Sequence, residues 1–202
     1  MSPRSAETNQ AIREESRARI LEHALALFAE RGFDRATVRA IAESAGISQG
    51  LLYNYFGSKE ELLVAIFERS MEDVRVSFQR AEAAGEGGRT AALVRAAFQV
   101  LRRNERFWRL SYGLRMQAPV LAGLGEGLHQ WTTEVRRTLE RYLSEDGFEG
   151  PELEAAILFA TIDGIAQHYV LDPHRYPLEE IVERVAARYA PPEVEGSPAS
   201  PR

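Results

Sequence analysis

The sequence predicts an all-α protein in which an N-terminal three-helix helix-turn-helix domain is joined to a larger C-terminal helical domain. Apolar residues recur at helical spacing along most of the chain, and no segment alternates polar and apolar residues as a strand does. Glycine and proline fall between the periodic segments. A chain of 202 residues, 45% of them hydrophobic, is long enough to bury a core in one medium or two small domains.

Helices in the first part of the chain are indicated by apolar stripes and by residues that cap helix ends. They are expected over residues 16–31, 37–45, 48–56 and 58–84. Thr37 and Ser48 are typical N-cap residues. Ser58 and Glu61 have the spacing of a capping box, which predicts the start of the long fourth helix.

The rest of the chain predicts five further helices, separated by glycine and proline. They are expected over residues 90–104, 105–117, 124–145, 152–171 and 178–190. The expected organisation is a disordered arm at 1–12, a helix-turn-helix domain at 13–59, a second helical domain at 60–190 and a disordered tail at 191–202.

Several classes of function are disfavoured by what the sequence lacks. The absence of cysteine excludes disulfides and thiolate metal sites. The four histidines are far apart in sequence, so no metal site is expected, and no cofactor either. No catalytic motif is recognisable, so we expect no enzyme. No apolar segment is long enough for a membrane helix and the N-terminus lacks a signal core, so we expect no membrane partner and a cytoplasmic location.

The segment from Thr37 to Phe56 has the pattern of two short helices joined by a tight turn at Gly46. It resembles the N-terminal motif of the TetR/AcrR family of transcriptional regulators, and the likeness covers about residues 16–67 without a gap. The matching positions are Thr37, Ile41, Ala42, Ala45, Gly46, Ile47, Ser48, Gly50, Leu52, Tyr53, Tyr55, Phe56, Ser58, Lys59, Glu60 and Leu62. At Tyr55 the family often has histidine, and a phenol can also donate to phosphate.

The resemblance implies that this motif binds double-stranded operator DNA. The residues expected at phosphates are Thr37, Ser48, Tyr53, Tyr55 and Lys59. Those expected at the major groove are Arg39, Gln49, Gly50 and Leu51. Hydroxyls and helix N-termini donate to phosphate, and arginine and glutamine read base edges. For each residue alone, a cap, a packing side chain or a solvated charge is an equally good interpretation.

The resemblance also implies a homodimer built from residues 152–171 and 178–190, which would bind a pseudo-palindromic operator. The sequence is consistent with this, because the first of these helices has apolar residues on two faces. A charge at Ile165 or Val185 should weaken association if those positions face the partner. The alternative is a helix that is simply central in a monomer.

A small, mostly apolar effector is the third expected partner, and its binding would release the operator. Candidate ligand-binding residues are Phe98, Trp108, Tyr112, Met116, Trp131, Phe159, Ile162 and Asp163. Plain core packing is the competing interpretation of each aromatic residue. Two other functions stay open: a small-molecule carrier or enzyme that retains a relic helix-turn-helix, and a DNA-binding regulator without a ligand.

The charge of the N-terminal part bears on how DNA would be bound. Residues 1–60 carry eight basic and eight acidic side chains and are therefore neutral, although the chain as a whole has a net charge of -5. Hydroxyl contacts to phosphate release no counterions, so we expect DNA binding to depend only weakly on salt. A steep dependence would indicate instead that the N-terminal arginines dominate.

Overall fold

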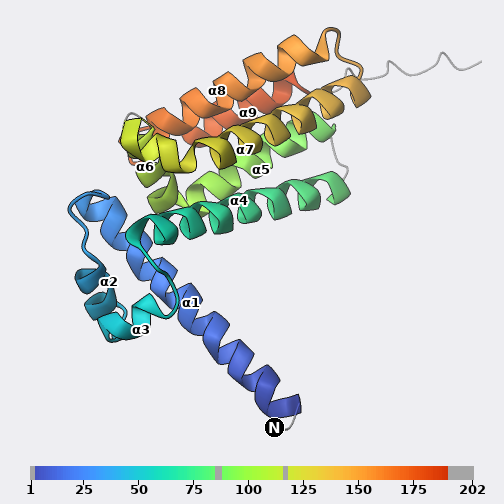
Figure 1. The fold of residues 1–202 in the computed structure, drawn as a ribbon. Coiled ribbons are helices and arrows are strands. Elements are labelled where there is room, and N and C mark those ends of the chain that lie inside the picture. Colours follow the sequence, from blue (N-terminus) through green and yellow to red (C-terminus); the bar gives the residue numbers. More distant parts are fainter. Residues whose placement is uncertain (1–2, 85–87, 116–117, 191–202) are drawn as a thin grey trace, which may run out of the picture. The chain divides into compact units, whose positions relative to one another are not determined.

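The computed structural model describes residues 3–84, 88–115 and 118–190, and within them the regular secondary structure is entirely helical (Figure 1). The helices are α1 (Pro3–Arg31), α2 (Val38–Ser44), α3 (Gln49–Tyr53), α4 (Lys59–Ala84), α5 (Arg89–Arg103), α6 (Glu105–Leu114), α7 (Ala118–Glu145), α8 (Pro151–Leu171) and α9 (Leu178–Arg188). The prediction of an all-α fold is confirmed. None of the described helices is long and apolar enough to cross a membrane.

The helices form two compact units, which are described separately here. The first unit comprises the chain up to Asp73 together with Leu101–Gln130, and the second comprises Val74–Val100 together with the chain from Trp131 onward. The first unit therefore contains α1, α2, α3 and α6, and the second contains α8 and α9. Helices α4, α5 and α7 each contribute to both units.

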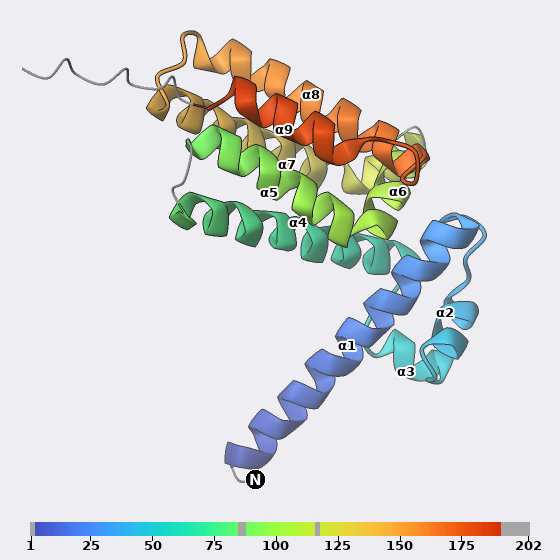
Figure 2. The same cartoon turned by 180° about the vertical axis from the view of Figure 1, so that it is seen from behind.

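The first unit is organised around the C-terminal half of α1. Ile20, Ala24 and Phe28 form its buried stripe, and each is 1% exposed or less. This stripe is the helical pattern expected of a core-facing helix. Helix α1 packs against α2 and α6, and α2 packs against α3 (Figures 1 and 2). The recognisable helix-turn-helix therefore lies against a helix that supplies most of its core.

Helix α4 begins at the capping box expected from the sequence. The Ser58 hydroxyl accepts a hydrogen bond from the backbone N–H of Glu61 at 3.1 Å. The Glu61 carboxylate in turn accepts from the backbone N–H of Gly57 at 2.6 Å. The Ser58 hydroxyl thus satisfies an N–H that the first turn of the helix leaves without a helical partner, and the Glu61 carboxylate satisfies the N–H of the residue just before the N-cap.

Polar contacts join the ends of several helices in the second unit. The Asp146 carboxylate, just after α7, accepts from the backbone N–H of Thr90 at 2.8 Å and so caps the start of α5. The Tyr189 hydroxyl, just after α9, donates to Glu154 of α8 at 2.6 Å. Burial, together with the hydrogen bond that its hydroxyl donates to the Glu82 carboxylate, raises the pKa of Tyr142 to about 12. These phenols therefore stay protonated in the folded chain at neutral pH.

Two helices begin earlier than the sequence suggested. Helix α1 begins at Pro3, whereas residues 1–12 were expected to be disordered, so that expectation is wrong for residues 3–12. Once a helix is nucleated, each added residue gains a backbone hydrogen bond at little cost, so a polar extension needs no apolar stripe. Helix α7 begins at Ala118 rather than near 124, and continues through glycines that usually disfavour helix.

Candidate DNA-binding surface, partner surface and ligand residues

Both short helices of the helix-turn-helix begin at the residues expected to cap them. The Thr37 hydroxyl accepts from the backbone N–H of Ala40 at 3.1 Å. The Ser48 hydroxyl accepts from the backbone N–H of Leu51 at the same distance. Between the helices, Gly46 adopts a φ of 69°, a left-handed conformation that other residues disfavour. The turn thereby sets the angle at which α3 leaves α2.

The packing of α3 leaves one side of this helix free for a partner. Leu52 is fully buried, whereas Leu51 is 42% exposed and Tyr53 48% exposed. Gln49 and Gly50 are also exposed. A short helix that exposes a leucine and a tyrosine beside two small or polar residues has a surface suited to contact, because such groups gain by burial. Three of the residues expected at the major groove, Gln49, Gly50 and Leu51, are thus exposed on α3.

Arg39 lies on the exposed side of α2 and is already paired within the chain. Its Nε donates to the Glu43 carboxylate at 2.8 Å, one helical turn away. This hydrogen bond raises the pKa of Arg39. Both side chains are largely exposed, so the pair is weak and can exchange. A base contact by Arg39 would require its guanidinium to leave Glu43.

Lys59 has a structural role that the sequence did not predict. Its Nζ donates to the backbone carbonyls of Phe33 at 2.8 Å and Asp34 at 3.3 Å. The same ammonium lies 4.4 Å from the centroid of the Phe33 ring. Lys59 therefore ties the start of α4 to the loop between α1 and α2, which positions the whole motif. Two of its three N–H donors are used in this way.

Tyr55 is half-buried after α3, and two arginines of α1 lie beside it and its neighbour. The guanidinium carbon of Arg13 is 5.8 Å from the centroid of the Tyr55 ring. That of Arg17 is 5.0 Å from the centroid of the Phe56 ring. The sequence reasoning counted both arginines as charges and did not place them at the motif. Their four-residue spacing could have shown that they share a face of α1, but not what that face meets.

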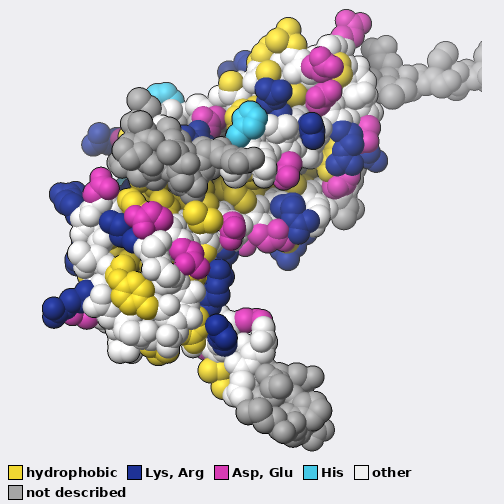
Figure 3. Space-filling model, in the orientation of Figure 1, with side chains coloured by type: hydrophobic (Ala, Val, Ile, Leu, Met, Phe, Trp, Pro, Cys, Tyr) yellow, Lys and Arg dark blue, Asp and Glu magenta, His cyan; other side chains and the backbone are white. Residues whose placement is uncertain are grey.

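The two faces of α8 have different surroundings. Leu158, Ile165 and Val170 are buried within the chain. The opposite face exposes large apolar side chains: Leu153 at 70% and Ile157 at 49%. Hydrophobic side chains over α8 are visible on the surface (Figure 3). Such a surface on a single chain indicates a contact with another molecule.

Helix α9 buries its apolar stripe inside its own chain. Leu178, Val182 and Val185 belong to this stripe, and Val185 is 7% exposed. On α8, Ile165 is likewise only 9% exposed. The condition that Ile165 and Val185 face a partner is therefore not met, because both side chains already contact the core of the second unit. The large apolar residues of α8 that remain exposed are Leu153, Ile157 and Leu171.

The expected ligand-binding residues fall into both units and are described within each. In the first unit, Trp108 and Tyr112 of α6 have ring centroids 6.3 Å apart, and the Arg115 guanidinium lies 4.6 Å from the Tyr112 centroid. In the second unit, Trp131 and Phe159 have centroids 6.3 Å apart in an edge-to-face arrangement.

The remaining expected ligand residues differ in their exposure. Phe98 is a core residue of the second unit and is 3% exposed. Ile162 and Asp163 of α8 are half-buried. Met116 lies outside the described residues. Core packing is thus an adequate account of Phe98 and of Trp108, which is 8% exposed. The other described candidates, Tyr112, Trp131, Phe159, Ile162 and Asp163, keep some exposed surface.

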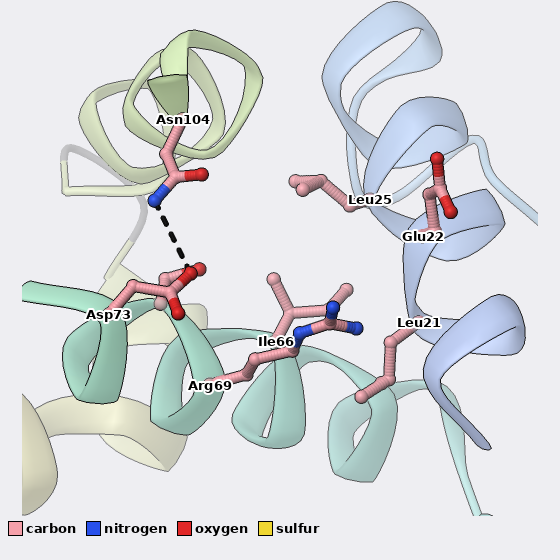
Figure 4. Close-up of a pocket in the computed structure, with 8 residues that line it drawn as sticks. Leu21, Glu22, Leu25, Ile66, Arg69, Asp73 and Asn104 are labelled. Atoms are coloured by element: carbon pink, nitrogen blue, oxygen red, sulfur yellow. Dashed lines mark hydrogen bonds between the residues drawn. The ribbon is translucent and has the colours of Figure 1, made fainter. Parts of the chain in front are cut away.

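A pocket that the sequence did not suggest opens in the first unit, between α1, α4 and the residue before α6 (Figure 4). It holds about 140 Å³ and is lined by Leu21, Glu22, Leu25, Ile66, Arg69, Ser70, Asp73 and Asn104. The Asn104 amide donates to Asp73 at 3.4 Å across it. None of the expected ligand-binding residues lines this pocket. No local motif in the sequence predicts this pocket, since its walls come from segments that are far apart in sequence.

Comparison with known families accounts for both units. Residues 20–66 match the bacterial regulatory proteins of the tetR family, and residues 87–190 match the C-terminal domain of BetI-type transcriptional repressors. The second match alone covers more than half of the chain. The chain belongs to the tetR family. The resemblance inferred from the motif at Thr37 to Phe56 is therefore confirmed.

Curated relatives of this tetR-family chain are similar over part of their length. It is 37% identical to the HTH-type transcriptional repressor KstR2 of Rhodococcus jostii over 87 residues. This stretch is 42% of this chain and 43% of that protein. It is 55% identical over 47 residues to KstR2 of Mycobacterium tuberculosis, 23% and 24% of the two chains. The matched region thus spans less than half the length of these relatives.

Solved structures of similar fold cover nearly the whole tetR-family chain. A transcriptional regulator from Rhodococcus sp. Rha1 has a TM-score of 0.72 at 24% identity, covering 86% of this chain and 95% of that one. FadR from Bacillus subtilis, in complex with stearoyl-CoA, has a TM-score of 0.69 at 21% identity, covering 86% and 97%. The SmeT–triclosan complex has a TM-score of 0.70 at 23% identity, covering 93% and 98%.

The family match also separates shared from individual features of the DNA-binding surface. The motif residues from Thr37 to Lys59 lie inside the matched range of 20–66. Arg13 and Arg17 lie before it, on the part of α1 that the match does not reach. The family match thus includes α2 and α3 but not the two stacked arginines.

Proposed function

We propose that the chain is a homodimeric transcriptional repressor that binds a pseudo-palindromic operator and releases it when a small, mostly apolar ligand binds. The observation that carries the proposal is the exposed side of α3. Gln49, Leu51 and Tyr53 face solvent there, although Leu52 between them is fully buried. In a homodimer, two such helices would enter successive major grooves about 34–36 Å apart.

The caps of the short helices and the proposed phosphate contacts are compatible. Thr37 and Ser48 each use a hydroxyl lone pair to accept from the helix they cap. Each hydroxyl therefore keeps its O–H to donate to a phosphate oxygen. Tyr53 and Tyr55 can donate in the same way. Lys59 keeps one N–H for a phosphate, and its larger contribution is to hold the start of α4 in place.

Base reading is assigned to the first turn of α3 and to Arg39. Gln49 can bind adenine through two hydrogen bonds, and Leu51 can contact a thymine methyl group. Gly50 has no side chain, and its Cβ position is open, so the backbone can approach the groove closely there. Arg39 can bind guanine once it has left Glu43.

The dimer is proposed to form through residues 152–171 and 178–190, with α8 as the main contact. The exposed apolar face of α8 includes Leu153 and Ile157. A two-fold axis brings the same face of a second copy against it, so that both faces are buried at once. Helix α9 would contribute through its outer residues, because its apolar stripe is already covered.

The ligand is proposed to be a mostly apolar small molecule that contacts the aromatic residues. Candidate contacts are Trp108 and Tyr112 in the first unit, and Phe98, Trp131, Phe159, Ile162 and Asp163 in the second. Two proteins of similar fold are in complex with compounds that have a large apolar part: FadR of Bacillus subtilis with stearoyl-CoA, whose coenzyme A group is charged, and SmeT with triclosan. These complexes support an apolar group on the ligand. Release requires that the ligand prefer the state that does not bind DNA, typically by about 1–3 kcal/mol.

The DNA-binding part is tested by selecting preferred sequences from a random pool and measuring affinity by fluorescence anisotropy. We expect an enriched palindromic sequence. Tyr53→Phe should weaken all sequences alike, whereas Gln49→Ala should change the preferred bases. Tyr176→Phe, which removes a phenolic hydroxyl in the second unit, is the matched control. It should change neither the overall affinity for DNA nor the preferred bases. Equal binding to all sequences would refute specific operator recognition.

The ligand part is tested by adding stearoyl-CoA or triclosan to the complex with the selected sequence. A compound that binds the protein should lower operator affinity, and operator DNA should weaken binding of the compound by the same factor. Trp108→Ala should reduce both effects. A compound that binds without changing operator affinity would rule out release as the mechanism, and binding of a compound without any DNA binding would favour a carrier.

A further inference from the structure

The N-terminal part of α1 places two unneutralised cations beside the helix-turn-helix. Helix α1 begins at Pro3, so residues before Ile20 extend it beyond the part that supplies the core. Arg13 and Arg17 are four residues apart and thus share one face of this extension. Both are exposed, and among the described residues neither forms an ion pair with a carboxylate.

Aromatic stacking holds both guanidinium groups at the segment that follows α3. The distances to the Tyr55 and Phe56 ring centroids, 5.8 and 5.0 Å, are within the range of about 6 Å in which a cation is attracted to a ring face. A guanidinium that lies over a ring keeps its N–H donors, which lie in its plane, available at the edge. Arg13 and Arg17 are therefore oriented without being neutralised.

The location of the two arginines indicates their partner. Tyr55 is one of the residues proposed to contact a phosphate, and the Arg13 guanidinium lies against the ring of that same residue. A polyanion that reaches Tyr55 thus meets Arg13 beside it and Arg17 one helical turn further along α1. Guanidinium groups bind phosphate oxygens through paired hydrogen bonds. The chemistry and the position both fit the sugar–phosphate backbone of DNA.

We propose that Arg13 and Arg17 bind operator phosphates, so that the N-terminal extension of α1 is a third element of the DNA-binding surface. This inference rests on the proposed function. The charges of residues 1–60 sum to zero, but they are unevenly distributed over the surface. Cations can therefore contribute to DNA binding although this region is neutral as a whole. The eight acidic side chains of that region leave these two arginines unpaired, at the place where a phosphate backbone would pass.

The consequence is a steeper dependence of operator affinity on salt than hydroxyl contacts alone would give. Each phosphate that a cation neutralises contributes about 0.9 to the slope of log affinity against log salt. Two arginines in each of two protomers would contribute about 3.6. Between 50 and 200 mM salt, this term weakens binding by roughly 150-fold.

The experiment measures operator affinity by fluorescence anisotropy between about 50 and 200 mM KCl, for the wild-type chain and for Arg13→Gln with Arg17→Gln. We expect the slope of log affinity against log salt to be about 3.6 shallower for the double variant than for the wild type. Arg19→Gln is the matched control, since Arg19 is exposed on another face of the same helix, and its slope should equal the wild-type slope. Arg13→Lys with Arg17→Lys keeps the charges and should keep most of the slope.

The outcomes separate this inference from the function on which it rests. If the wild-type chain binds its operator and the double glutamine variant has the wild-type slope, the arginines only fasten α1 to Tyr55 and Phe56, and the inference is wrong. The same holds if the control variant loses as much slope as the double variant. If the wild-type chain binds no operator, the proposed function fails and the inference fails with it.

Discussion

Replacing Ile157 by serine tests whether the exposed face of α8 forms the dimer. Ile157 keeps 49% of its surface exposed in the single chain. Full burial of such a side chain stabilises by about 1.5–3 kcal/mol, so burial of the exposed half contributes roughly 0.7–1.5 kcal/mol per copy. A two-fold interface contains two copies. The variant should therefore lose about 1.5–3 kcal/mol of association free energy, which raises the dimer Kd by roughly 10–150-fold.

The assay is sedimentation equilibrium or light scattering over a concentration series, with thermal unfolding monitored in parallel. Ile12→Ser is a matched control, because Ile12 is also an isoleucine, is 55% exposed and lies on α1 in the first unit. It should leave the dimer Kd unchanged. A half-exposed position tolerates serine better than a core position does, so Ile157→Ser should remain folded.

Two results would refute the reasoning. One is a wild-type chain that is monomeric at all concentrations, which would leave the α8 face without a second copy to cover it. The other is a dimer that Ile157→Ser weakens no more than Ile12→Ser does, which would place the interface elsewhere. Leu153→Ser, at a position 70% exposed on the same face, gives an independent check of the second result.

Three further predictions concern stability. Gly46→Ala should lower the free energy of unfolding by about 1–2 kcal/mol in urea titrations, because alanine is strained at a φ of 69° although its Cβ would meet no neighbour. Lys59→Met should lower it by roughly 1–2 kcal/mol, since two carbonyls lose a charged donor, and a variant as stable as the wild type would contradict this. The hydrogen bond from Arg95 lowers the pKa of Glu183, so the stability that this pair adds is present at neutral pH and lost as the pH falls below about 4.5. Glu183→Gln should thus be less stable than the wild type at pH 6, by about 0.2–1 kcal/mol, and equally stable at pH 3.

Local signals in the sequence predicted most helices and the start of each helix in the motif. Thr37, Ser48 and Ser58 each accept from a backbone N–H three residues later, as their cap positions require. These interactions span a single turn, so a short segment contains all the information. The extension of α1 to Pro3 was missed because a polar helix that continues from a packed one shows no apolar periodicity.

Contacts between distant segments could not be predicted, and they decide what several candidate residues do. The bonds from Lys59 to Phe33 and Asp34 join positions about 25 residues apart. The two apolar faces of α8 were visible in the sequence, but which face turns inward depends on packing by other helices. For that reason the sequence left open whether Ile165 faces a partner, and the structure buries it within the chain.

The contacts inside the first unit suggest how a ligand signal could reach the DNA-binding helices. Trp108 adjoins Phe107 in α6, and Phe107 packs edge-to-face on Phe67 of α4 with ring centroids 5.0 Å apart. Helix α6 also packs directly against α1, which carries the core of the motif. A ligand that displaces Trp108 would therefore act on α6, α4 and α1 within one compact unit. Packed interiors transmit such shifts because they deform little, so a displacement of α6 would reach the helix-turn-helix through both α4 and α1.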